Sequence, residues 1–170
     1  MKNQAKLYGP GLEAYPKKGI FFSNIIMILW IALGTFACWL VHPLIGWLYF
    51  AFSTKMIFIV LRKMVCTNCY YYARWCSTGW GKLSCAFFKK GKIENFKTST
   101  GIKITPFTYG LLTLVPLILL IISLIQKYST FKLAVLALLL SVSVYSGAIS
   151  RKKACSNCKM KAMCPGSALK

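Results

Sequence analysis

The residues best suited to chemistry in this chain are its cysteines, because two similar C-x2-C motifs recur along the sequence. Residues 62–69 read R-K-M-V-C-T-N-C and residues 151–158 read R-K-K-A-C-S-N-C. We call residues 66–76, which end in a third cysteine, the first knuckle, and residues 155–164, which also end in one, the second knuckle. The six repeated cysteines are Cys66, Cys69, Cys76, Cys155, Cys158 and Cys164.

Two cysteines separated by two residues can direct both sulfur atoms at one metal ion. The surrounding lysines and arginines are expected to lower the pKa of these thiols and to favour the thiolate, which is the form that binds metal. The spacing favours an iron–sulfur cluster, with zinc as the next choice. Metal-free thiol chemistry and transient binding of a soft metal are further alternatives. Cys164-Pro165 resembles the Cys-Pro pair that ends ferredoxin cluster motifs, over these two residues.

The number of metal centres is left open by the sequence. Cys85 is a candidate seventh ligand, because it would complete a four-cysteine set with the first knuckle. The second knuckle would then need a fourth ligand from elsewhere, or would keep an open position. Alternatively, the six repeated cysteines form one composite centre or two close ones.

The rest of the composition excludes most enzymes that depend on carboxylates or histidine. The chain has 170 residues, no Asp, and only Glu13, Glu94 and His42 as other acid–base candidates. The chain therefore lacks the residues that glycosidases, two-metal nucleases, EF-hands and Ser/His/Asp enzymes require. The net charge of +20 comes from dispersed basic residues without a recognised binding module, so nucleic acid is an unlikely partner.

The elements that must position the cysteines are membrane helices, since 57% of the chain is hydrophobic. We predict an all-α integral membrane protein with four transmembrane helices at residues 19–41, 44–61, 104–126 and 133–150. His42-Pro43 would make the first tight turn, because proline begins a helix well. Pro116 falls inside the third helix, where a neighbour would have to satisfy the carbonyl that it frees.

The helices are expected to form two tandem helical hairpins, each followed by a cysteine knuckle, as the product of an internal duplication. An offset of 89 residues superimposes the two motifs and also moves residues 44–61 onto residues 133–150. The corresponding divisions are a cytoplasmic N-terminal segment 1–18, hairpin 19–61, cysteine-rich basic loop 62–103, hairpin 104–150 and cysteine-rich tail 151–170.

The distribution of cations predicts the orientation. Nineteen lysines and arginines precede the first helix, lie in the central loop or lie in the tail, whereas only Lys127 and Lys132 lie in a hairpin turn. The positive-inside rule then places both termini and both knuckles on the cytoplasmic side of the cell (inner) membrane, against anionic lipid headgroups. Lys55 falls in the second predicted helix, where it either snorkels to the headgroups or binds an anion, quinone oxygen or proton as a cofactor-site residue.

Taken together, these patterns predict membrane electron transfer or redox sensing, as a subunit or partner of a larger complex. The first alternative is a zinc-stabilised membrane adaptor or assembly factor without redox activity. The second is a soft-metal transporter or sensor. The composition fits a non-catalytic electron-transfer or structural membrane subunit better than an enzyme.

Overall fold

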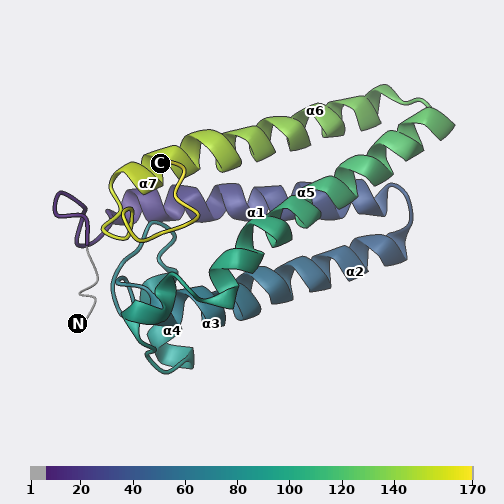
Figure 1. The fold of residues 1–170 in the computed structure, drawn as a ribbon. Helices are drawn as coiled ribbons and strands as arrows, with labels where there is room; N and C mark the ends of the chain where they lie inside the picture. Colours follow the sequence, from purple (N-terminus) through teal and green to yellow (C-terminus); the bar gives the residue numbers. More distant parts are fainter. Residues whose placement is uncertain (1–6, 170) are drawn as a thin grey trace.

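The computed structural model describes residues 7–169, and this part of the chain is all-helical (Figure 1). Four helical stretches are long and apolar enough to cross a membrane: Lys17–Trp39, Pro43–Asn68, Ile93–Gln126, in which a turn at residues 97–99 precedes the long helix, and Thr130–Ser156. The prediction of an all-helical chain with four helices long and apolar enough to span a membrane is therefore confirmed for the described residues. The predicted divisions 1–18 and 151–170 extend into residues 1–6 and 170, which lie outside the described residues.

Several of these stretches are built from more than one kind of helix. The first is α1 (Lys17–Trp39), and the second joins α2 (Pro43–Thr54), a π-helical segment η1 (Lys55–Val60), α3 (Leu61–Val65) and a 3-10 turn η2 (Cys66–Asn68). The central loop holds α4 (Trp80–Phe87) and the 3-10 turn η3 (Ile93–Phe96). The remaining elements are α5 (Thr100–Gln126), α6 (Thr130–Val144), a second π-helical segment η4 (Tyr145–Ser150) and α7 (Arg151–Ser156).

The predicted turn between the first two helices lies at His42-Pro43. The Nδ1 atom of His42 accepts a hydrogen bond from the backbone N–H of Leu44 at 3.2 Å, so His42 acts as the N-cap of α2. Pro43 occupies the first helical position, where its missing N–H has no intrahelical partner to lose. The single histidine therefore has a local structural role.

The helices that lead into the knuckles are longer than hydropathy predicts. The second and fourth were predicted to end at residues 61 and 150, yet helical structure continues through Val65 and Ser156. Hydropathy marks where the apolar run ends, whereas arginine and lysine are good helix formers and carry the backbone further. As a result Cys155 lies inside α7, and Cys66 immediately follows α3.

The apolar core of the bundle centres on α1, which packs against α2, α5 and α6. Pro116 lies inside α5 and cannot donate to the carbonyl of Leu112 four residues before it. The Tyr49 hydroxyl donates to this carbonyl at 2.8 Å, so a neighbouring helix satisfies the group as expected. Gly34 on α1 makes this approach possible, because a Cβ there would lie 2.5 Å from the Tyr49 hydroxyl oxygen.

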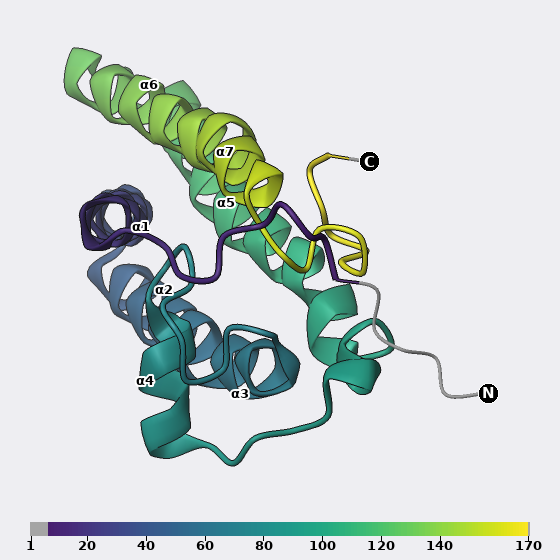
Figure 2. The same ribbon diagram turned by 90° about the vertical axis from the view of Figure 1, so that its left-hand side faces the viewer.

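Both knuckles lie at the same end of the bundle, next to the first turns of α1 and α5 (Figure 1). A second apolar cluster forms here around Phe96, Ile102 and Met160, with Cys69 and Cys158 packed against it. Figure 2 looks at this end and shows the chain before α1 crossing it beside the C-terminal segment. The cysteine-bearing segments therefore have a core of their own, separate from the core between the long helices.

Candidate functional site

The first two turns of each knuckle have the same backbone hydrogen bonds at an offset of 89 residues. In the first knuckle the N–H of Cys69 donates to the carbonyl of Cys66, and the N–H of Tyr72 donates to the carbonyl of Cys69. In the second, Cys158 donates to Cys155 and Lys161 donates to Cys158. The N···O distances are 3.3 and 3.1 Å in both knuckles. The shared sequence pattern therefore folds into the same local turns twice.

The similarity continues past the C-x2-C motif. The Arg74 N–H donates to the carbonyl of Tyr71 at 2.9 Å, and the Met163 N–H donates to the carbonyl of Met160 at 3.0 Å. The side chains of Tyr71 and Met160 are 2% and 1% exposed, so this position is buried in both knuckles.

Backbone N–H groups also point at the sulfur atoms. The N–H of Tyr71 interacts with the thiol of Cys69, and the N–H of Met160 interacts in the same way with Cys158. In the first knuckle the Gly81 N–H donates to Cys76 Sγ at 3.3 Å. Donors of this kind stabilise thiolates and metal-bound sulfur.

The tertiary structure brings the six repeated thiols near one another. Cys69 interacts electrostatically with Cys66, Cys76 and, across the two knuckles, Cys158. Cys158 interacts in turn with Cys155 and Cys164. We call Cys66, Cys69 and Cys76 the first triad, and Cys155, Cys158 and Cys164 the second triad.

The expectation that nearby cations lower the thiol pKa values is wrong for Cys69, Cys158 and Cys164. Burial raises the pKa of Cys69, and the neighbouring thiols raise it further. Burial likewise raises the pKa of Cys158 and of Cys164, although the Arg151 guanidinium opposes this at Cys164. At these thiols the loss of hydration on burial outweighs the attraction of the nearby cations.

Within residues 7–169, no three His, Cys, Asp or Glu side chains form a group that could hold a metal ion. Cysteine sulfur is a suitable ligand for a thiolate-bound metal, and the backbone N–H groups near the sulfur atoms would stabilise such ligands. The thiols of a triad would nevertheless have to move closer together to bind one. Iron–sulfur and zinc binding therefore remain predictions.

The other predicted site residues lie away from the buried thiols. Cys85 is exposed on α4, and its thiol donates to the carbonyl of Lys82 at 2.9 Å. Lys55 begins η1 and is exposed on the outside of the bundle, which favours the snorkelling alternative. Cys38 is 0% exposed in the core between the long helices, as expected for a cysteine that packs as a small hydrophobic residue.

Sequence reasoning missed two residues beside the first triad. Arg62, on α3, and Ser84, on α4, both lie against the thiol of Cys66, which is only 8% exposed. The Arg62 guanidinium also lies 4.9 Å from the centre of the Trp80 ring. The arginine was visible in the repeated motif, whereas nothing near Ser84 in the sequence indicates that α4 folds back onto Cys66.

The segment before α1 is also part of the site, which the sequence did not predict. Leu12 forms a parallel bridge with Cys158, and the Leu12 carbonyl accepts a hydrogen bond from the Tyr71 hydroxyl at 2.7 Å. The same hydroxyl accepts from the backbone N–H of Lys159 at 3.1 Å. A Cβ on Gly11 would lie 2.6 Å from that backbone nitrogen, so only glycine fits there without a shift. Tyr71 thus links both knuckles and the N-terminal segment.

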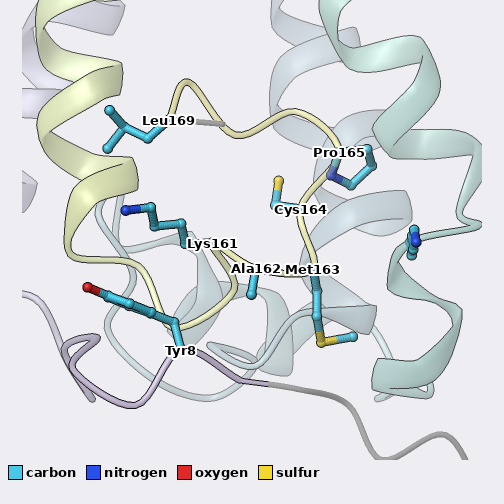
Figure 3. Close-up of a pocket in the computed structure, with 8 residues that line it drawn as sticks. Tyr8, Lys161, Ala162, Met163, Cys164, Pro165 and Leu169 are labelled. Atoms are coloured by element: carbon cyan, nitrogen blue, oxygen red, sulfur yellow. The ribbon is translucent and has the colours of Figure 1, made fainter.

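A cavity of about 470 Å³ adjoins the second triad (Figure 3). Cys164, Met163 and Lys161 line it from the C-terminal segment, and Tyr8 lines it from the N-terminal one. Its walls are open and carry two lysines, Lys97 and Lys161. The second triad is therefore reachable from solvent at Cys164.

No family model, curated protein or solved structure matches this chain.

Proposed function

We propose that this chain is a membrane protein that binds a cysteine-ligated metal centre at the knuckle end of its bundle, and that it acts in electron transfer or redox sensing as part of a larger complex. The observation that carries the proposal is the convergence of six thiols through two sets of equivalent turns, with backbone N–H groups directed at the sulfur atoms. Such donors favour metal-bound thiolate over neutral thiol.

In this proposal the first and second triads supply the ligands, and an iron–sulfur cluster is the favoured group. The cluster would supply one-electron chemistry when bound. The chain's own residues would hold it, shield it from water with Tyr70, Tyr71 and Trp80, and neutralise its negative charge with Arg62 and Arg151.

The test is anaerobic purification of the full chain in detergent, followed by visible absorption and elemental analysis of iron, zinc and acid-labile sulfide. We expect a brown protein with iron and sulfide in matching amounts, and loss of both in the variant Cys69→Ser. Cys38→Ser is the matched control, because Cys38 is buried in the other core. A sample without any metal would refute the proposal.

A second candidate function is a zinc-stabilised adaptor or assembly factor. It is favoured by the position of Cys69, Cys158 and Cys164 against the apolar cluster that joins the central loop to the tail. A metal there would crosslink segments that are far apart in sequence, which is the usual effect of structural zinc. Stoichiometric zinc in a colourless sample would support this function and exclude electron transfer.

We further propose that the two halves of the chain arose by duplication of a hairpin with its knuckle. The matching hydrogen bonds at an offset of 89 residues support this. A second support is that both helices leading into a knuckle contain a six-residue π-helical segment shortly before it: η1 ends at Val60, before Cys66, and η4 ends at Ser150, before Cys155. Because π-helical segments are rare, their recurrence is a feature that independent helices would not be expected to share.

We also propose that the knuckle end faces the cytoplasm across the cell (inner) membrane and rests on anionic headgroups. The cation distribution supports this orientation, and α4 suits an interfacial position because Leu83 and Phe87 are 47% and 75% exposed beside lysines. A membrane-impermeant maleimide tests it on Cys85, which is exposed. We expect labelling in inside-out vesicles and protection in right-side-out vesicles; the reverse result would refute the orientation.

A further inference from the structure

A groove of about 430 Å³ lies between the start of α1 and the loop that leads into α4. It shares no lining residue with the cavity beside the second triad. Its walls are largely apolar: Ile20 and Phe21 contribute from α1, and Trp75, Trp80 and Leu83 contribute from the central loop and α4. Figure 2 shows this loop reaching the start of α1. The groove therefore lies where the first span meets α4, the helix that suits an interfacial position.

The two walls of the groove are fixed to each other by hydrogen bonds. The side-chain amide of Asn24 on α1 donates to the carbonyl of Thr78 at 3.0 Å and accepts from Trp80 Nε1 at 3.3 Å. Gly79, between these two loop residues, has a φ of 75°, and a Cβ there would lie 2.7 Å from the Ile20 side chain. The walls are held in place without a ligand, so a ligand that fits loses little affinity to reorganisation.

The lip of the groove is apolar and uncovered. Phe21 and Leu83 are 70% and 47% exposed. In the proposed membrane placement the first turns of α1 lie at the boundary between headgroups and acyl chains, because α1 is long and apolar enough to span the bilayer. Exposed apolar side chains at this depth contact acyl chains. An occupant that extends over this lip therefore needs an apolar part.

Two lysines flank the groove without an acidic residue among its walls. Lys17 lines the groove from the first turn of α1, and the Lys82 ammonium lies 4.8 Å from the centre of the Trp75 ring, which forms part of the wall. Both lysines are exposed, so their ammonium groups can turn towards a ligand. The only acids of the chain, Glu13 and Glu94, do not line the groove. An apolar wall beside uncompensated positive charge complements an anionic group attached to a hydrocarbon chain.

We propose that this groove binds one anionic phospholipid, with its phosphate near the ammonium groups of Lys17 and Lys82 and an acyl chain along Phe21, Trp80 and Leu83. This inference rests on the proposed placement of the knuckle end at the headgroups and names a specific lipid site there. Dispersed cations attract an anionic surface as a whole, whereas a fixed groove selects a single molecule by both of its parts. The bound lipid bridges α1 and α4, and so anchors the central loop to the bilayer.

The test uses the full chain in a non-ionic detergent and phospholipids that carry bromine on their acyl chains. Bromine quenches the fluorescence of a tryptophan that it contacts, so Trp75 and Trp80 report on the groove. The chain is titrated with brominated phosphatidylglycerol, which is anionic, and with brominated phosphatidylcholine, whose headgroup has no net charge. We expect saturable quenching at lower concentrations of phosphatidylglycerol. This headgroup dependence should be lost in Trp75→Phe/Trp80→Phe, because Trp30, Trp39 and Trp47 lie outside the groove.

One pair of variants tests the charge. Lys17→Gln/Lys82→Gln should weaken the binding of brominated phosphatidylglycerol by about 10–30-fold, because each cation near an anionic headgroup contributes roughly a fivefold factor. Its control, Lys89→Gln/Lys92→Gln, removes the same charge from exposed residues outside the groove and should bind as the wild type does.

A second pair tests the apolar wall. Leu83→Ser should weaken the binding of both brominated lipids by a similar factor of about three to ten, because less apolar surface is covered. Leu133→Ser is the matched control, since Leu133 lies on α6 and is 42% exposed, close to the 47% of Leu83.

Three results would refute the inference. Quenching by phosphatidylcholine at the same concentrations as phosphatidylglycerol would show that the headgroup is not recognised. Equal binding by Lys17→Gln/Lys82→Gln and its control would show that these lysines play no part. Displacement of the lipid by millimolar glycerol phosphate, which has the headgroup without the acyl chains, would make the ligand a soluble phosphate compound.

The inference and the proposed function can fail separately. Metal and sulfide are measured before any lipid is added. A protein that holds a metal but binds both lipids equally keeps the proposed function and loses the lipid site. A protein without metal that still prefers phosphatidylglycerol loses the proposed function and keeps the lipid site.

Discussion

The first knuckle is enclosed by other elements, whereas the second lies at the end of a helix and opens towards solvent. Around the first, Arg62 on α3 and Ser84 on α4 lie against Cys66, which is 8% exposed, and Arg62 is partly buried against Trp80. Around the second, Arg151 is exposed and a cavity reaches Cys164. The two share their turns because turns depend on local sequence. They differ in their surroundings because surroundings depend on which helices fold back over them.

The comparison gives the thiols of the two triads different surroundings. In the first, the Gly81 N–H donates to Cys76 Sγ and Cys66 is 8% exposed, which would suit a shielded centre under the proposed function. The second has an open cavity beside Cys164. The following predictions test this difference, starting with the largest expected effect.

The largest contrast is expected between two glycines. A Cβ on Gly81 would overlap the carbonyl oxygen of Tyr71 and lie 2.6 Å from that of Arg74, whereas a Cβ on Gly166 would meet nothing closer than 3.6 Å. Gly81→Ala should therefore destabilise the first knuckle by about 1–3 kcal/mol, and Gly166→Ala should leave the second intact. Alkylation rates of Cys66 and Cys164, followed by mass spectrometry, measure the opening of each knuckle. Each rate is compared with that of the same cysteine in the wild type. An equal increase at Cys66 in Gly81→Ala and at Cys164 in Gly166→Ala would contradict the enclosed character of the first knuckle.

The link between the knuckles should depend on one hydroxyl group. Tyr71→Phe removes the donor to the Leu12 carbonyl and the acceptor for the Lys159 N–H, while the ring stays packed. We expect the free energy that docks the second knuckle to become about 1–2 kcal/mol less favourable. Hydrogen exchange at the Lys159 amide should then be roughly tenfold faster. The control is Tyr72→Phe, because the Tyr72 hydroxyl donates to the carbonyl of Phe88 in the central loop and contacts neither segment of the bridge. Unchanged exchange at Lys159 would show that the knuckles dock without this bridge.

The smallest effect is expected at the ion pair between the N-terminal segment and the second knuckle. Glu13 accepts from Lys159 Nζ at 3.2 Å, but the Glu13 side chain is 77% exposed. Exposed pairs contribute less than about 1 kcal/mol and are screened by salt. Glu13→Gln should change hydrogen exchange at Lys159 less than Tyr71→Phe does, and added salt should abolish the difference. A larger effect than that of Tyr71→Phe would mean that charge, and not the Tyr71 bridge, joins these segments.

Much of the fold could be predicted from local features. The apolar runs indicated four spans, His42-Pro43 indicated the turn, and Pro116 indicated a carbonyl in need of a partner. The helix ends were less predictable. Hydropathy drops at Arg62, where the apolar run ends, but arginine and lysine are good helix formers and the helix continues past it. The partner of the Leu112 carbonyl was not readable either, since Tyr49 lies on a helix whose packing against α5 is a tertiary property.

The sequence by itself determined the kinds of side chain available for chemistry and the turns that present them, because a C-x2-C motif after a helix folds through hydrogen bonds among its own residues. Only the tertiary structure decided which groups surround the sulfur atoms. Ser84, Tyr71 and Leu12 reach the two triads from distant parts of the chain. Burial by these segments also reversed the expected direction of the thiol pKa values, because desolvation depends on everything packed around a group and not on its neighbours in sequence.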